Sequence, residues 1–182
     1  DVIIRNNSIY DNADRGIQFY PHAVDSRVYG NVIDGNGQGV IFSSAGDQAS
    51  TGNLVEGNVI SNSRLRWNAE SYWEDAVGEG NVVRHNCVWT SDENGYYSQN
   101  GGVQTPQLGA SGFSAEENVI GNPQFVDRAS GDFSLQAGSP CEFIHGGSGV
   151  PAPGSVTLEK HQQAVVEGAP LTLTGRVDSP TT

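Results

Sequence analysis

The stretch VYGNVIDGNGQGVIF, residues 28–42, alternates short apolar runs with Asn and Gly. Its central phrase, an Asn followed by two mostly apolar residues, recurs with Asn7, Asn58, Asn86 and Asn118 in the place of Asn31. Successive Asn residues are 24 to 32 positions apart (31−7 at the shortest, 118−86 at the longest). A repeat of this length indicates a solenoid, in which each unit buries its apolar face only by stacking on its neighbours.

Two columns of apolar residues accompany these Asn residues. The column three positions before each Asn consists of Ile4, Val28, Val55, Val83 and Ala115. The column two positions after it consists of Ile9, Ile33, Ile60, Val88 and Ile120. Mostly β-branched side chains at such positions are typical of inward-facing strand residues. A third strand is expected at 16–20 and at 39–42 in the first two repeats. The sequence therefore predicts an all-β fold, a coil of parallel strands with about five turns.

Each marked Asn is expected at a sharp corner between two strands, where a short amide tolerates left-handed backbone geometry. Amides stacked about 4.8 Å apart can hydrogen-bond along the coil and satisfy one another in the interior. A second set of residues is expected to mark the next corner in the same way: Asn12, Asn36, Asn62 and Asn122.

The charge balance excludes several kinds of partner. The 182-residue chain has a net charge of −12 and a single lysine, Lys160. Nucleic acids and anionic membranes both require a basic surface, so neither is expected as a partner. No stretch is long and apolar enough to insert into a membrane. Because Asp1 opens in the middle of a repeat, we expect further coils upstream. Cys87 and Cys141 form either one disulfide or two buried thiols.

On these repeats, residues 1–148 resemble the C-terminal coils of a right-handed parallel β-helix domain of the secreted bacterial kind. The segment GNPQFVDRASGDFSLQAGSP (121–140) resembles the strap that closes such domains. The resemblance implies an extracellular protein, secreted or on the cell surface, whose partner is a polysaccharide or cell-surface glycan. It specifies no activity, because the family includes polysaccharide lyases, glycoside hydrolases, epimerases, surface proteins and phage spikes.

The C-terminal part of the chain differs in composition. Residues 149–154 read as a Gly/Pro linker. Residues 155–182 contain two alternating segments around a turn, a short β-hairpin tail that resembles the start of a bacterial immunoglobulin-like module. Two strands do not make a stable sandwich. We therefore expect a truncated module and neighbouring domains of a larger chain.

The resemblance implies a substrate groove along the third strand of each turn, with Gln18, Tyr20 and Ile41 facing outward. The loops that leave this strand lengthen along the coil, from 21–27 to 43–53 and 68–81, as is common on the binding side of a solenoid. Aromatic rings stack on sugars, while carboxylates bind their hydroxyl groups. The candidate carbohydrate-binding residues are Gln18, Tyr20, Trp67, Tyr72, Trp73, Glu74 and Asp75. The alternative is that Trp67 and Trp73 pack their loop onto the coil.

The candidate catalytic residues are Asp14, Arg15 and His22, with Tyr20 nearby in sequence. A lyase that acts on a uronic acid needs a cation to neutralise the carboxylate and a base to remove the adjacent ring proton. Arg15 suits the first role, and His22 or Tyr20 the second. The alternative is a solvated turn with an ordinary surface histidine.

Hydrolysis would need two carboxylates about 5 to 10 Å apart, which Asp11, Asp14 and Asp34 on neighbouring turns can provide. The Asn-Thr-Asp and Arg-Ile-Lys motifs of β-helical pectin hydrolases are absent. The repeated Asp pairs of calcium-dependent pectate lyases are absent too. No cofactor is expected. Calcium is only weakly indicated, because neither Glu74-Asp75 nor 92–94 has regular ligand spacing.

An open solenoid end exposes strand edges and apolar interior. We expect residues 122–144, the strap, to close this end. Four apolar residues are expected to cover the final turn: Phe125, Phe133, Leu135 and Phe143.

Two functions follow from the sequence. The first is an enzyme, a polysaccharide lyase or glycoside hydrolase, that binds and processes a polysaccharide. The second is a non-catalytic surface, adhesive or spacer protein with immunoglobulin-like modules.

Overall fold

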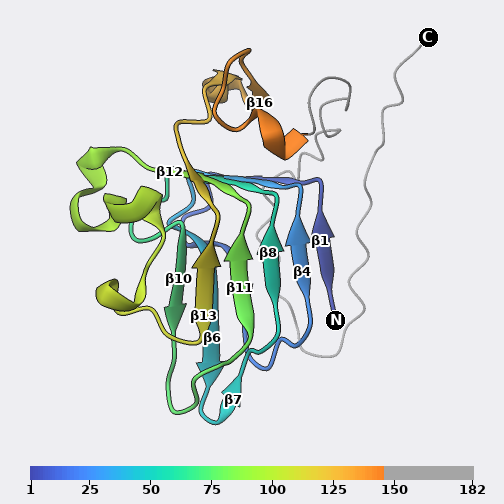
Figure 1. Ribbon diagram of the computed structural model, residues 1–182, viewed down its shortest axis with the longest axis vertical. Helices are drawn as coiled ribbons and strands as arrows, with labels where there is room; N and C mark the ends of the chain where they lie inside the picture. The colour runs from blue at the N-terminus through green and yellow to red at the C-terminus, as the bar shows by residue number, and fades with distance from the viewer. Residues whose placement is uncertain (146–182) are drawn as a thin grey trace.

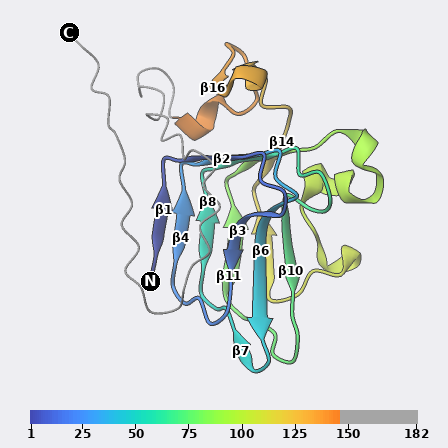
Figure 2. The same cartoon turned by 180° about the vertical axis from the view of Figure 1, so that it is seen from behind.

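A computed structural model describes residues 1–145 of the chain, which form three parallel β-sheets (Figures 1 and 2). Sheet A has the order β1–β4–β8–β11–β13, with the bounds Ile3–Arg5, Arg27–Tyr29, Leu54–Glu56, Asn81–Arg84 and Phe113–Glu116. Sheet B has the order β2–β5–β9–β12–β14, with the bounds Ser8–Tyr10, Val32–Asp34, Val59–Ser61, Cys87–Trp89 and Val119–Ile120. Sheet C has the order β3–β6–β10, with the bounds Arg15–Phe19, Gln38–Ala45 and Ala69–Tyr72. The expected all-β class with parallel sheets is confirmed.

The remaining elements are short. Strand β7 (Gln48–Ala49) pairs antiparallel with the end of β6, and β15 (Phe125–Asp127) pairs antiparallel with β16 (Asp132–Leu135). Four 3₁₀ segments complete the described chain: η1 (Asp92–Gly102), η2 (Pro106–Leu108), η3 (Arg128–Ser130) and η4 (Glu142–His145). None of the helices within residues 1–145 has the length and apolar character needed to cross a membrane.

The chain visits sheets A, B and C in turn, so residues one repeat apart lie side by side in the three-sheet stack. In sheet A, Val28 pairs with Val55, and Val55 with Val83. In sheet B, Ile33 pairs with Ile60, which also pairs with Val88. These six side chains are at most 1% exposed, and they form one core with inward residues of sheet C: Ile17, Phe19, Val40, Phe42 and Ala69.

Buried amides link the turns at the corner between sheets A and B. Asn58 Nδ2 donates to Asn86 Oδ1 (2.9 Å), and Asn31 Nδ2 donates to Asn58 Oδ1 (2.9 Å). The same contact extends to Asn7 at one end and Asn118 at the other. The left-handed residue is not the marked Asn but the one before it, for example Gly30 (φ 65°) and Gly57 (φ 62°). The Asn side chain therefore supplies hydrogen bonds, while its predecessor makes the bend.

The second corner differs from the sequence-based alignment. Asn12 Nδ2 donates to Asn36 Oδ1 (2.8 Å), as an amide pair. Because Asp34 pairs with Ser61 in sheet B, Asn62 lies one position earlier in the turn than Asn36, and Ser63 occupies the position of Asn36. Ile120 pairs with Val88, which pairs with Ile60. Asn122 and Asn62 each lie two residues further on, so they occupy the same position in their turns. Asn62 and Asn122 thus do not continue the amide pair.

A third amide pair lies at the corner that leads into sheet A. Asn53 Nδ2 donates to Asn81 Oδ1 (2.8 Å), and Asn53 Oδ1 accepts from the Ser26 backbone N–H (3.0 Å). Each of these two Asn residues follows a left-handed glycine, Gly52 or Gly80 (both φ 67°). The sequence analysis did not predict this corner, although a Gly-Asn dipeptide stands there in both turns.

The strap does not cover the end of the stack. Phe133 and Cys141 instead pack on Val32, Val59 and Cys87, the outward residues that open strands of sheet B. Both views show the strap, in orange, along one side of the stack (Figures 1 and 2). The last turn remains open, with Val119 37% and Ile120 55% exposed, and Phe143 is 46% exposed. The expectation that the strap lies over the final turn is wrong, because the outward Val32, Val59 and Cys87 in the middle of sheet B needed cover.

A disulfide attaches the strap to sheet B. Cys87 and Cys141 are bonded, with their Cα atoms 5.4 Å apart, so of the two alternatives the disulfide is present. The Gly/Pro linker at 149–154 and the expected immunoglobulin-like module at 155–182 lie outside the described residues.

Candidate functional site: the outer face of sheet C

Strand alternation places six side chains of sheet C opposite the core residues of the same strands, and we call these six the sheet-C face: Gln18, Tyr20, Ile41, Ser43, Glu70 and Tyr72. Gln18, Tyr20 and Tyr72 are exposed, whereas Ile41, Ser43 and Glu70 are buried between them. Arg15, at the start of β3, lies close enough to Glu70 to act on its charge. Gln18 Nε2 donates to Ser43 Oγ across β3 and β6 (3.0 Å). The sequence analysis placed the groove on this face.

Two tyrosines project from the margins of the sheet-C face. Tyr20 directly follows β3 and is 49% exposed, while Tyr72 ends β10 and is 58% exposed. Ile41 was also expected to face a groove, but it is only 2% exposed. Ile41 lies in the middle strand, between Gln18 of β3 and Glu70 of β10. The longer side chains of these two neighbours cover it.

Glu70 is the most perturbed ionisable group of this face. Its side chain is fully buried, and its Oε2 accepts hydrogen bonds from Arg66 Nε (2.8 Å) and Nη2 (2.6 Å). Its Oε1 has no hydrogen-bond partner among residues 1–145. Burial raises the pKa of the Glu70 carboxyl above its ordinary value, although the positive charges of Arg66 and then Arg15 oppose this. A buried carboxyl with one free oxygen is equipped to hold or move a proton.

The sequence analysis missed Glu70, Arg66 and Gln38. Glu70 was assigned to a loop, whereas it lies in β10 and pairs with Ile41. Gln18 pairs with Ile41, and Ile41 with Glu70, but the spacing grows from 23 residues (41−18) to 29 (70−41), so the repeat did not point to Glu70. Gln38 Oε1 is likewise buried without a partner among the described residues.

The three proposed catalytic residues are not brought together. Asp14 Oδ2 and Arg15 Nη1 form an ion pair (2.9 Å) at the start of β3. His22 is exposed and left-handed (φ 55°), and it lies beyond the other end of the strand. A strand rises about 3.3 Å per residue, so the five residues of β3 hold His22 well away from Arg15.

The carboxylates considered for hydrolysis also have separate roles. Asp34 is fully buried and accepts from Arg128 Nε of the strap, while Arg128 Nη2 donates to Asp11 (3.3 Å). Asp14 is paired with Arg15. Asp11 and Asp34 therefore hold the strap instead of facing a substrate across a groove.

The aromatic loop candidates divide into packing and exposed residues. Trp67 is 1% exposed and packs edge-on against Tyr96 and Tyr97. Trp73 contacts the core, and its Nε1 donates to the Ser111 carbonyl (2.8 Å). Both tryptophans thus follow the packing alternative, and only Tyr72 of the three aromatic candidates in this region offers a largely free ring.

The two acidic loop candidates lie beside the β6–β7 hairpin. Glu74 Oε2 accepts from the Gly46 backbone N–H (2.8 Å), and its own N–H donates to Ser44 Oγ (2.9 Å). Asp75 is exposed next to it. Glu74 thus joins two neighbouring loops, which stiffens the wall beside Tyr72.

Metal binding has no visible centre in the described part of the chain. Residues 1–145 contain no group of three or more His, Cys, Asp or Glu side chains placed to hold an ion. Glu74 and Asp75 follow β10, whereas Asp92 and Glu93 open η1, so the two acidic pairs belong to separate segments.

Comparisons with protein-family models, curated proteins and solved structures found no match for this chain.

Proposed function

We propose that the sheet-C face binds a polysaccharide chain laid along the stack. The observation that carries the proposal is the pair of exposed rings, Tyr20 directly after β3 and Tyr72 at the end of β10, which flank Ser43 of the middle strand at opposite margins of the sheet-C face. Strands lie about 4.8 Å apart, so the two rings can contact different sugar units of one chain. Tyrosine rings stack on sugars, while the exposed amide of Gln18 suits hydroxyl groups.

The charges favour a neutral polysaccharide over a polyanion. Arg15 is paired with Asp14, and Arg66 with Glu70, so the cations near the face are locally balanced. The whole chain carries −12 charges, which repel a polyanion at long range. These features support a glycoside hydrolase type of processing more than a lyase acting on uronic acids.

Processing would assign the proton donor to Glu70. A carboxyl whose pKa is raised stays protonated to a higher pH, as a general acid requires, but the Glu70 side chain is fully buried and does not reach a glycosidic oxygen in this conformation. Hydrolysis also needs a second carboxylate, and Glu70 is the only one in the sheet-C face as defined. This specific observation favours the second candidate, a binding protein without turnover of the surface, adhesive or spacer type.

An extracellular location belongs to the same proposal. The Cys87–Cys141 disulfide supports it, because disulfides persist in oxidising compartments. The resemblance to secreted right-handed parallel β-helices is supported by the three parallel sheets. Immunoglobulin-like neighbours and a cell-surface glycan partner remain part of this proposal.

One experiment separates the two candidates. The protein is titrated with soluble xylan, β-glucan and polygalacturonate, and the same mixtures are assayed for new reducing ends and unsaturated products. We expect binding of a neutral polymer. New reducing ends that disappear in Glu70→Gln would establish hydrolysis, whereas binding without products would establish the non-catalytic function. Absence of binding to all three polymers would contradict the proposal.

A further inference from the structure

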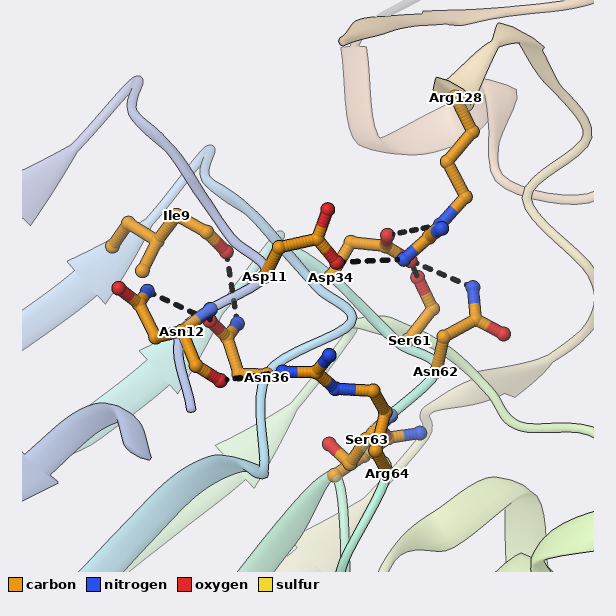
Figure 3. A network of polar contacts seen from close by, with 11 residues as sticks. Ile9, Asp11, Asn12, Asp34, Asn36, Ser61, Asn62, Ser63, Arg64 and Arg128 are labelled. Carbon is orange, nitrogen blue, oxygen red and sulfur yellow. Dashed lines mark hydrogen bonds and ion pairs between the residues drawn. The ribbon is translucent and has the colours of Figure 1, made fainter. Parts of the chain in front are cut away.

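A cleft of about 690 Å³ lies between the strap and the corner that connects sheets B and C. One wall comes from residues 62–64 after β9 and from 89–94, at the end of β12 and beyond it. The other wall comes from strap residues 122–128. Figure 3 shows the strap reaching this corner through Arg128, with Asn62, Ser63 and Arg64 below it. No residue of the sheet-C face lines the cleft.

The fold explains why a hollow persists here. The disulfide anchors the strap on sheet B, and Arg128 attaches it to Asp34 in the second turn. The third and fourth turns carry insertions at the same corner, where Arg64 N–H donates to the Asn36 carbonyl (2.8 Å) and Asn94 Nδ2 to the Ser63 carbonyl (2.8 Å). Both walls are thus held by separate contacts.

The cleft combines an aromatic surface with unused amides. Trp89 is half-buried in one wall, and Phe125 lies in the other. Asn122 and Gln124 are exposed at the strap side. Asn122 Oδ1 accepts only from the Gln124 backbone N–H (3.0 Å), and the Gln124 side-chain amide has no partner within residues 1–145. Amides beside an aromatic ring match the alternating hydroxyl and C–H surfaces of a sugar.

A break in the amide pairing places one further polar group in the wall. In the first two turns this corner carries Asn12 and Asn36, which bond to each other. The third turn has Ser63 instead, and its buried hydroxyl has no partner in the described part of the chain. A buried hydroxyl that the fold leaves unsatisfied is rare, but this one has almost no exposed surface, so the side chains that offer polar groups to the cleft are Asn122 and Gln124.

The charges at the cleft leave a small negative excess. Arg128 is shared between Asp34 and Asp11, so its charge is compensated. Of the remaining two charged lining residues, Arg64 is positive and Glu93 is negative, and both are exposed. These two arginines and three carboxylates sum to one negative charge, which gives no long-range attraction for an anionic ligand. Its volume lies within the range typical of small-molecule sites, roughly 300–1,000 Å³.

We infer that this cleft is a second binding site, which takes a short neutral saccharide of one or two sugar units. The inference does not rest on the function proposed for the sheet-C face. An open sheet face suits a polymer, whereas this cleft, bounded by the strap, suits a short molecule or a chain end.

Saturation-transfer NMR on the full chain tests the inference, with cellobiose, maltose and lactose as probes. We expect saturable binding of at least one disaccharide, weakened about tenfold or more in Asn122→Ala/Gln124→Ala. Both residues are exposed, so the variant should fold. The matched control is Gln107→Ala, an exposed amide in η2 away from the cleft, which should bind like the wild type.

The sheet-C variant Tyr20→Ala/Tyr72→Ala separates the two sites and should leave disaccharide binding unchanged. The inference is overturned if no probe binds, or if the double amide variant binds like the wild type. Loss of disaccharide binding in the tyrosine variant alone would also overturn it, because the ligand would then occupy the sheet-C face.

Discussion

Arg128 of the strap donates its Nε hydrogen to Asp34, a fully buried carboxylate 94 residues earlier in β5. The same carboxylate accepts from Ser61 Oγ (2.7 Å) and from Asn62 Nδ2 (2.7 Å). A buried charge needs both a partner and hydrogen bonds. The strap is therefore positioned over the second turn by the polar contact that Figure 3 shows, in addition to its apolar packing on sheet B.

Removing this guanidinium should destabilise the protein. Arg128→Ala leaves the Asp34 carboxylate buried without its countercharge. The loss is discounted from the value for a fully buried pair because the arginine side chain is 40% exposed. We expect about 2 to 3 kcal/mol less free energy of unfolding by urea titration. Arg27→Ala, an exposed arginine without an ion pair in residues 1–145, should change it by under about 0.5 kcal/mol. Equal effects of the two variants would contradict this role.

The disulfide should contribute a comparable amount by restricting the unfolded chain. Cys87 and Cys141 close a loop with a sequence separation of 54. The loop-entropy relation gives about 4 kcal/mol for a loop of this length. We expect the double variant Cys87→Ala/Cys141→Ala to lose roughly that amount in urea unfolding. The bond itself is tested by titrating thiols in the unfolded, unreduced protein, where two reactive thiols would exclude it.

The buried Asn column makes a position-dependent prediction. Asn58→Ala removes the acceptor of the Asn31 amide (2.9 Å) and the donor to the Val28 carbonyl (3.0 Å), both in the interior. Each unsatisfied buried group costs about 1 to 3 kcal/mol, so we expect a loss of about 3 kcal/mol or more. Asn7→Ala changes the same residue type at the exposed end, and should cost under about 1 kcal/mol. Equal losses in Asn58→Ala and Asn7→Ala would contradict the prediction, because burial of the amide would then make no difference to stability.

Glu70 should make stability depend on pH with a defined sign. Its pKa is raised in the folded state, so the folded protein binds the proton more tightly than the unfolded chain. Stability should therefore fall as pH rises from the ordinary Glu value of 4.5 through the raised value. The glutamine of Glu70→Gln cannot ionise. As pH rises through this window, the free energy of unfolding of the variant should therefore increase relative to that of the wild type. Parallel pH profiles in urea unfolding would contradict the assignment.

The sequence predicted the parallel stack because its columns of Ile and Val recur at one structural position in every turn. It did not place the strap. The repeated phrase contains two adjacent apolar residues, such as Val32-Ile33, of which only the second faces the interior. The first needs cover on the outside of sheet B. The alternation of apolar and polar residues in the strap predicts which side chains are buried, but it does not predict the surface against which they pack.

The sequence predicted where the candidate site lies, on the outer face of the third strands, but it predicted only some of the residues that form it. Alternation along β3 identified Gln18 and Tyr20 as outward residues. Trp67 was misleading because an aromatic residue in a loop suits packing and sugar binding equally, and the insertion with Tyr96 and Tyr97 buries it. The insertions after β9 and β12 interrupt the repeat, so local spacing did not reveal Glu70 or the cleft.

The most direct test of the central claim, that the sheet-C face binds a polysaccharide, is calorimetric titration with soluble xylan and β-glucan. We predict that the wild type binds one of them and that Tyr20→Ala/Tyr72→Ala binds it at least about tenfold more weakly, a loss of about 1.4 kcal/mol. Tyr29→Ala on sheet A is the control and should bind like the wild type. A double tyrosine variant that retains full affinity, or a wild type that binds neither polymer, would contradict the claim.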